Sequence, residues 1–415
     1  FKTASLTPQP SNARDFYNTG KTSLTNINFS KAGDAYNVRV SYTNLRIDGL
    51  IPNSELKRNT LTTNFSINMG SKWTLGGNIN IIQQTSNTEN DDQYSNQSTG
   101  SFNQWFHRDV DMGILKEMEN YRTPEGIYAS WNHANPNAYD AANPKGFYGA
   151  NYWMNPYSYF NLIQNNNTRS RVFGDVSLSY KINNDLKITG TYRKQQLATD
   201  GSRVYPNELE ISANQNSFNP YEGTGKAAYG VTNSYSNRNS GELVLTYGKK
   251  IKDFSVNANA GYVTFNNILT GSNQNTMGGL NVPGLYSLAN SKNAINYGQT
   301  YQAYKQRALF VTGTVGYKST FYLDGSYRQD YTSAEPTGTH ISAYSVGASF
   351  VFSDYIKDKS ILSYGKLRAS SGQVVEALLP YDLNVLYTPA AQQFNGNFII
   401  TEPGTIPSPT LRGST

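Results

Sequence analysis

Runs of about ten residues in which apolar and polar side chains alternate dominate this sequence. In one of them, Tyr36, Val38 and Val40 are separated by Asn37 and Arg39. Similar runs recur along the whole chain, and no helical period of comparable length accompanies them. Because successive side chains of a strand point to opposite faces of a sheet, the pattern predicts half-buried β-strands and an all-β fold.

The alternating runs predict about twelve strands. They cover residues 22–31, 35–46, 56–69, 72–86, 169–182, 186–198, 239–251, 254–268, 305–318, 320–332, 340–354 and 361–372. Short connections alternate with long ones, and the longest lie at 87–168, 199–238 and 269–304. Strict alternation puts every long loop on one side of the sheet. This arrangement is typical of a transmembrane antiparallel β-barrel with short periplasmic turns and long extracellular loops.

The average polarity of the chain is compatible with such a barrel. Charged residues make up 15% of the 415 residues, and the mean hydropathy is −0.59. No stretch approaches the roughly 20 apolar residues of a spanning helix, which excludes a helical membrane protein. Every second residue of a barrel strand can face water, whereas the others contact lipid. Aromatic residues near the strand ends, such as Trp73 and Tyr262, are expected to form interfacial girdles.

Composition and motifs exclude several classes of function. The chain has no Cys, which rules out a disulfide scaffold and a thiolate metal site. Its net charge of +6 is spread without a basic block, so no nucleic-acid partner is expected. It has three His, but neither a nucleophile motif nor zinc-like spacing accompanies them. We therefore expect neither an enzyme nor a cofactor.

Short motifs follow one another along the chain in a specific order. They are residues 16–20 (FYNTG), 40–45 (VSYTNL), 49–54 (GLIPNS), 104–112 (QWFHRDVDM), 322–328 (YLDGSYR) and 366–370 (KLRAS). As a series they resemble SusC/RagA-type TonB-dependent transporters of Bacteroidetes outer membranes. The resemblance covers nearly the whole chain, although each motif alone is weak.

The resemblance implies the middle of a barrel of about 22 strands that encloses a plug domain. Residues 1–21 would lead into the barrel, 22–372 would form its central part, and 373–415 would form an extracellular loop or irregular tail. The plug, the segment that contacts TonB and the remaining strands are expected outside residues 1–415.

The implied function is active import of a bulky nutrient, a glycan or an oligopeptide, across the bacterial outer membrane. The TonB complex would supply the energy, a SusD-like surface lipoprotein would be the partner, and membrane lipid would cover the apolar face. Two alternatives stay open. One is a passive porin or structural barrel in an envelope assembly. The other is a soluble extracellular β-rich adhesin, whose strands would be shorter, at about five or six residues.

The loop 87–168 is rich in aromatic side chains, which can stack on sugar rings or on peptide side chains. Trp105, Trp131, Tyr152 and Trp153 are its candidate anchors for a substrate or partner, since aromatic residues are enriched at interface hot spots. The alternative is that these rings pack the loop against itself, because a long ordered loop needs a core of its own.

Charged residues supply two weaker candidate sites. Arg39, Arg193, Asp324 and Arg328 fall on the polar face of their strands, where they would contact a plug or substrate or simply keep the lumen wet. Asp109 and Asp111, in the long loop, have a spacing that calcium ligands can have. The Gly and terminal Glu of a calcium loop are missing, so a solvated acidic loop is favoured and no metal site is predicted.

Overall fold

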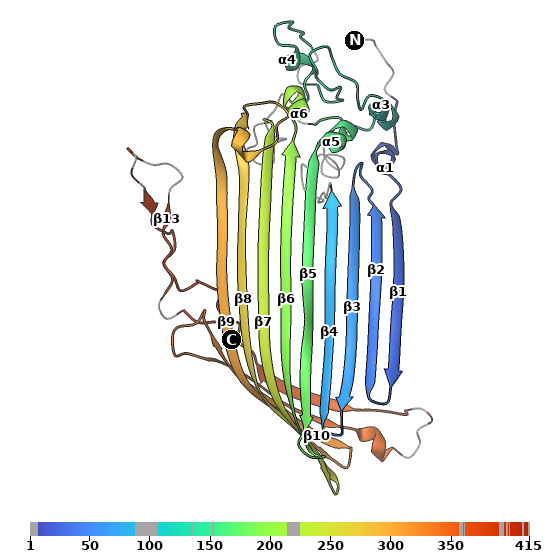
Figure 1. Cartoon of the computed structure of the whole chain (residues 1–415), viewed down its shortest axis with the longest axis vertical. Helices are drawn as coiled ribbons and strands as arrows, with labels where there is room; N and C mark the ends of the chain where they lie inside the picture. The colour runs from blue at the N-terminus through green and yellow to red at the C-terminus, as the bar shows by residue number, and fades with distance from the viewer. Residues whose placement is uncertain are drawn as a thin grey trace.

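Twelve strands form one antiparallel sheet in the computed structural model of the chain (Figure 1). The structure describes residues 7–87, 107–133, 137–151, 153–213, 225–356, 360, 362–389, 394–395, 397, 399–408 and 411–413. The strands are β1 (Lys21–Gly33), β2 (Tyr36–Asp48), β3 (Glu55–Met69), β4 (Trp73–Asn87), β5 (Gln164–Lys181), β6 (Leu186–Tyr205), β7 (Ala228–Ile251), β8 (Phe254–Leu280), β9 (Ser291–Tyr317), β10 (Phe321–Thr332), β11 (Ile341–Phe350) and β12 (Leu367–Gln373). They pair in sequence order, so the predicted all-β fold with neighbouring antiparallel strands is confirmed.

The described helices are short and lie outside the sheet, before β1 or in the connections between strands. They are α1 (Asn12–Phe16), α3 (Met112–Glu117), α4 (Pro144–Tyr148), α5 (Pro156–Leu162) and α6 (Asn207–Ser212), with 3-10 turns η2 (Leu288–Asn290) and η3 (Phe352–Tyr355). The α-helices gather at the end of the sheet where the long connections lie (Figure 1). The tail contains a small hairpin, β13 (Thr388–Pro389) and β14 (Ile400–Thr401). None of the helices within the described ranges has the length and apolarity needed to cross a membrane.

Strands β6 to β9 are much longer than predicted. The predicted loop 199–238 shrinks to 206–227, and the predicted loop 269–304 shrinks to 281–290. The connection predicted at 87–168 is also slightly shorter, because β4 ends at Asn87 and β5 begins at Gln164. These predicted bounds were wrong because the added strand segments are rich in polar residues, so their alternation is weaker than in the predicted runs. Where a strand leaves the lipid and has water on both sides, the apolar–polar alternation disappears although the backbone ladder continues.

Strands β11 and β12 are shorter than the predicted runs 340–354 and 361–372. After Phe350 the chain turns into η3, where the Thr320 hydroxyl donates a hydrogen bond to the Asp354 carboxylate at 3.2 Å. The Ser353 N–H then donates to the Gly365 carbonyl at 3.3 Å. These bonds hold the chain out of the ladder before β12 begins.

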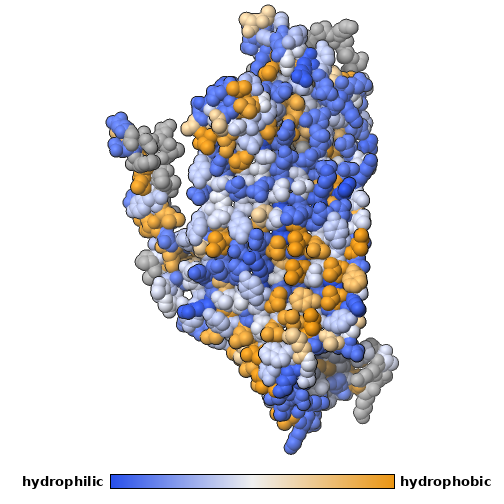
Figure 2. Space-filling view, viewed as in Figure 1, coloured by the Kyte–Doolittle hydropathy of each residue, from blue (hydrophilic) through white to orange (hydrophobic). Residues whose placement is uncertain are grey.

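The pairing register sorts the side chains of the sheet into two faces, because partners across a ladder point the same way. On one face Leu245 pairs with Ala260, Ala260 with Val311, and Val311 with Tyr327. Figure 2 shows apolar side chains concentrated in the lower half of the viewed face, toward the short turns. We call this belt the apolar band.

Aromatic rings border the apolar band at both of its edges. Next to the short turns, ring pairs join neighbouring strands, and they are Trp73–Tyr180, Phe254–Tyr317 and Phe321–Phe350, with centroids 4.5, 4.9 and 4.6 Å apart. At the upper edge, tyrosine hydroxyls contact polar side chains, in the pairs Tyr42–Asn59, Tyr192–Asn239 and Tyr327–Ser342, at 2.8, 2.9 and 3.2 Å. A ring in the interface with its hydroxyl toward water is the expected behaviour of a girdle tyrosine.

The width of the apolar band suits a bilayer. On β8 it runs from Phe254 to Tyr262, close to the roughly 9–11 residues that cross a bilayer at a tilt. The sheet therefore has the strand order and the apolar band of a transmembrane β-barrel wall, and its strands continue well beyond the band at the long-loop end. Within the described residues the sheet is open, with β1 and β12 as its two edges.

Candidate functional site

The face opposite the apolar band is lined by polar side chains, and we call it the lumen face. Hydroxyl and amide groups bond across its strands: Thr62 donates to Asn80 at 2.8 Å, and the hydroxyls of Ser179 and Thr189 lie 2.9 Å apart. In a transmembrane barrel the face that turns away from lipid borders the wet interior. The polar side chains of this face therefore suit a water-filled interior.

The four charged residues predicted for the lumen all lie on the lumen face. Arg39 and Arg193 share one cross-strand row, connected through Asn64, Asn78 and Asp175. Asp324 pairs with Thr314 and Gly347, and Arg328 pairs with Phe310 and Ala343, on the same side of the sheet.

Two of these charges are balanced by carboxylates of the wall itself. Arg193 forms an ion pair with Glu242 of the neighbouring strand. The guanidinium of Arg328 donates two hydrogen bonds of 2.8 Å to the carboxylate of Asp330. Arg39 donates instead to the Asn28 side chain at 3.2 Å. The balanced pairs explain Arg193 and Arg328 as parts of a wet wall without requiring a ligand.

The described part of the connection, residues 107–133, 137–151 and 153–163, folds over the long-loop end of the sheet as a cap, together with the lead-in segment, residues 7–20. Its main core, the Phe16 cluster, consists of Phe16, Met112, Leu115, Tyr157 and Phe160, all buried. The Phe16 ring lies 5.2 Å from Tyr157 in a T-shaped arrangement and 5.9 Å from Phe160. A second cluster, around Tyr205 and Leu209, joins α6 to the ends of β6 and β7.

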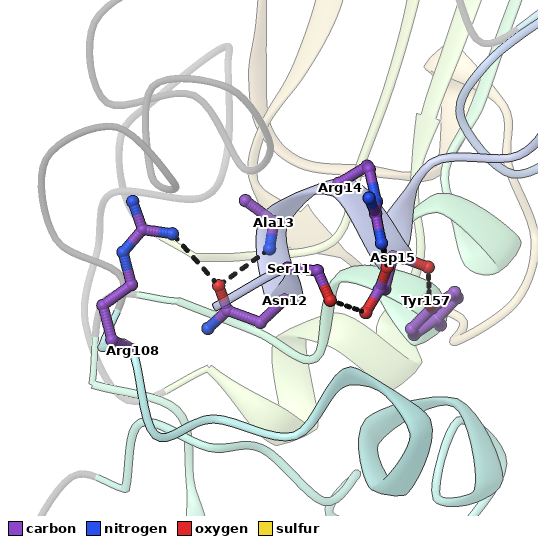
Figure 3. Close-up of polar contacts among 7 residues, drawn as sticks. All are labelled: Ser11, Asn12, Ala13, Arg14, Asp15, Arg108 and Tyr157. Atoms are coloured by element: carbon purple, nitrogen blue, oxygen red, sulfur yellow. Dashed lines mark hydrogen bonds and ion pairs between the residues drawn. The ribbon is translucent and has the colours of Figure 1, made fainter. Parts of the chain in front are cut away.

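Polar contacts fix the lead-in segment to the same cap (Figure 3). The buried Asn12 side chain donates to the carbonyl of His107 at 2.9 Å. The Tyr157 hydroxyl donates to the carbonyl of Asp15 at 3.4 Å. Burial raises the pKa of Tyr157 to about 12, so this hydroxyl keeps its proton and remains a donor. The Ser11 hydroxyl, at 2.6 Å, holds the pKa of the Asp15 carboxyl below its ordinary value.

Two of the four aromatic anchors predicted in the long loop, Trp131 and Trp153, lie within the described residues. Trp131 is half-buried against the Phe16 cluster, with its ring 6.1 Å from His107. Trp153 is also half-buried, and its carbonyl accepts a hydrogen bond from Ser130 at 2.7 Å. Trp105 and Tyr152 lie outside the described residues. A role of these residues as anchors stays a prediction.

Other rings of the same loop are used by the cap itself. Tyr128, Phe147, Tyr157 and Phe160 are all buried. Tyr139, in contrast, is 54% exposed. Self-packing thus accounts for part of the aromatic content of the loop.

The Asp109–Asp111 pair has a structural explanation for one member. The Asp111 carboxylate caps α3 by accepting hydrogen bonds from the N–H groups of Gly113 at 2.8 Å and Ile114 at 3.4 Å. Capping of this kind is what Asp commonly does at a helix start. Across the part of the chain that the structure describes, no group of three His, Cys, Asp or Glu could hold a metal ion.

Five further arginines of the lumen face escaped the sequence interpretation: Arg58, Arg169, Arg171, Arg203 and Arg238. Two of them lie outside the predicted strands. Arg203 and Arg238 fall inside the predicted loop 199–238, so they were assigned to no strand. The structure pairs Arg203 with Asn165 and Arg238 with Gln195, which places both on the lumen face. Its spacing from Arg193 could have placed Arg203. The two residues lie an even number of positions apart on one strand, and such residues share a face.

Comparison with known proteins shows which solved structures share this fold. The sequence matches no family model and no curated protein. A solved RagAB peptide transporter is 16% identical with a TM-score of 0.72, and the match covers 98% of this chain and 42% of that one. The RagAB peptide importer in its open-open state matches at 16% identity and a TM-score of 0.72, over 97% of this chain and 42% of that one.

A more distant structure points the same way. The ferric-catecholate import receptor Fiu from E. coli K12 is 11% identical, with a TM-score of 0.50 over 86% of this chain and 53% of that chain. The chain thus has the fold of the RagAB transporter over nearly its whole length, while it spans less than half of that protein. The resemblance to SusC/RagA-type transporters indicated by the motifs is confirmed for the fold.

Proposed function

We propose that this chain forms part of the wall of an outer-membrane transporter that actively imports a bulky nutrient, a glycan or an oligopeptide. The observation that carries the proposal is a bilayer-wide apolar band on a sheet that shares its fold with the RagAB peptide transporter over 98% of this chain. Energy would come from a TonB complex acting on a plug domain. A SusD-like surface lipoprotein would bind at the capped end.

The soluble adhesin fits the structure poorly. Large apolar side chains of the band are open to the surroundings: Leu309 is 54% exposed and Val346 is 50% exposed. Soluble monomers rarely expose a continuous apolar surface beyond a few hundred Å². These exposed apolar side chains are expected to contact lipid, which favours a membrane barrel over a soluble adhesin.

The passive porin differs from the proposal in its energy source. A porin has the same lipid face, but its lumen stays open and solutes pass by diffusion, whereas large plugged barrels need work to open. The two alternatives therefore make opposite predictions for a cell whose TonB complex has been removed.

We expect uptake through the full-length protein to require the TonB complex. Cells that carry the gene would be offered a fluorescently labelled mixture of oligopeptides and, separately, labelled oligosaccharides. Uptake of the transported class should fall, on deletion of the TonB gene, to the level of cells that lack the transporter. A small sugar that diffuses through general porins serves as the control. Undiminished uptake in the deletion strain would establish the porin and refute active import.

A further inference from the structure

The lumen face changes character above the apolar band. We call the region from the cross-strand row of Phe173, Gln195 and Arg238 up to the cap, over β1 to β9, the upper lumen wall. Five of its positions are arginines, and they are Arg58, Arg169, Arg171, Arg203 and Arg238. In the described strands, no Asp or Glu occupies a position of this wall.

The carboxylates of the same strand segments lie on the other face. Asp48 pairs with Glu55, and Asp200 pairs with Thr168, in the register that also holds the apolar band. On the lumen face, Asp175 and Glu242 lie below the upper lumen wall, where they face Arg193. The wall is thus charge-balanced near the lipid and positively charged toward the cap.

Two of these arginines are held in place by aromatic rings. The guanidinium of Arg171 lies 4.4 Å from the centre of the Phe173 ring, and its buried Nε has no hydrogen-bond partner. The guanidinium of Arg238 lies 5.1 Å from the Phe265 ring. A ring fixes the plane of a guanidinium but leaves its net charge and most of its N–H donors available. Such a group matches the two oxygens of a carboxylate.

A cavity of about 330 Å³ lies beside Arg238, at the lower limit of the upper lumen wall. It is lined by Phe173, Asp175, Arg193, Gln195, Arg238 and Ser240. Amide, hydroxyl and guanidinium donors meet there with one aromatic surface and with the Asp175 carboxylate, which lies opposite Arg193, so Arg238 is the guanidinium that a ligand carboxylate would contact. This set of groups can bind a carboxylate together with the polar part of the molecule that carries it.

We propose that the upper lumen wall binds the carboxylates of the imported nutrient, with Arg171 and Arg238 as its main contacts, so that the nutrient is an acidic oligomer. This inference rests on the proposed import function and names its substrate class. A carboxylate of an acidic oligopeptide and one of a uronic-acid oligosaccharide present the same chemistry to a guanidinium. The guanidinium groups of this wall draw an anionic solute toward the lumen.

Binding to the purified full-length protein in detergent tests the proposal. The probes are an Ala/Asp hexapeptide, its Ala/Asn isostere, tetragalacturonic acid and neutral tetragalactose, measured by calorimetry at low and high salt. The double variant Arg171→Gln/Arg238→Gln is compared with Arg307→Gln, a matched charge removal on the outer face, where Arg307 pairs with Tyr331. Arg171→Lys/Arg238→Lys retains both charges.

We expect the wild-type protein to prefer the acidic member of at least one probe pair by about tenfold or more, a preference that salt reduces. The double Gln variant should lose that preference and bind the neutral probe as before, whereas Arg307→Gln and the double Lys variant should keep it. The probe pair that responds identifies peptide or glycan as the source. Equal binding of acidic and neutral probes, or a preference that survives in the double Gln variant, overturns the proposal.

The outcome is separable from that of the import proposal. Binding to purified protein does not depend on the TonB complex, so uptake that requires TonB without an acidic preference refutes only this inference. An acidic preference without TonB-dependent uptake would instead describe an anion-selective porin. Electrophoretic mobility before and after boiling verifies that each variant is a folded barrel before its affinity is measured.

Discussion

Replacing Leu245 by Arg is expected to destabilise the inserted barrel by about 2–4 kcal/mol. Leu245 lies on the apolar face of β7, where it pairs with Ile188 of β6 and Ala260 of β8, between the aromatic edges of the band. A charged side chain at that depth loses its hydration, and lipid offers no partner. The free energy of unfolding would be measured for the full-length protein by denaturant titration in lipid vesicles.

The adjacent residue provides the matched control. Val244 is on the lumen face, where it pairs with Thr189 and Gly261, so an Arg there remains hydrated and should change stability little. The two variants differ by one position, and a slip of one residue in the register would exchange their effects. A larger loss for Val244→Arg than for Leu245→Arg would contradict the assignment of the faces.

Replacing Phe16 by Ala is expected to destabilise the cap by about 3–5 kcal/mol. Phe16 is 1% exposed and contributes the ring that Tyr157 and Phe160 pack against. The loss should be local, since the sheet has its own ladder of hydrogen bonds. Amide hydrogen exchange in α3 and α5 should therefore accelerate by more than about a hundredfold, while exchange in β7 and β8 stays the same.

An exposed residue of the same cap serves as the control for this variant. Ile114, in α3, is 53% exposed, so Ile114→Ala removes little buried surface and should leave exchange almost unchanged. Unaltered protection of α3 and α5 in Phe16→Ala would mean that the lead-in segment does not hold the cap together.

The alternation of apolar and polar residues predicted the strands only where lipid and water lie on opposite faces of the sheet. The run from Leu61 to Met69 contrasts strongly between its faces, and β3 forms there. Residues 269–280 and 291–304 have a weaker contrast between their faces, so the alternation predicts loops there, although they belong to β8 and β9. The local sequence does not reveal the backbone hydrogen bonds that a segment forms with a strand distant in sequence.

The cap was beyond prediction for a related reason. Its contacts join residues far apart in sequence, as when the Tyr157 hydroxyl donates to the Asp15 carbonyl 142 positions away. No periodic signal connects such segments. The aromatic content of the loop suggested a core of its own, but it did not indicate that Phe16 of the lead-in segment belongs to that core.

The candidate site was also predictable only in part. The position of Arg193 within its alternating run predicted the face on which it lies, whereas its charge partner depends on the pairing register of the strands. Arg193 pairs directly with Ser240, and its ion pair reaches the next lumen-face residue, Glu242. Arg203 and Arg238 became recognisable as lumen-face residues only when β6 and β7 extended through the predicted loop and brought them onto one face.

The proposed topology places the long-loop end of the sheet outside the cell and the short turns in the periplasm, and labelling from each side of the outer membrane tests it most directly. Residues 1–415 contain no Cys, so a single introduced Cys is a unique label site in this segment. Tyr139→Cys places the thiol on the exposed cap, and Asp253→Cys places it in the short turn between β7 and β8. Cells that express each full-length variant would be treated with a maleimide too large to pass porins. We predict that Cys at 139 is labelled in intact cells, and that Cys at 253 is labelled only after the outer membrane is permeabilised. Labelling of position 253 in intact cells to the same extent as position 139 would contradict a sheet that spans the outer membrane.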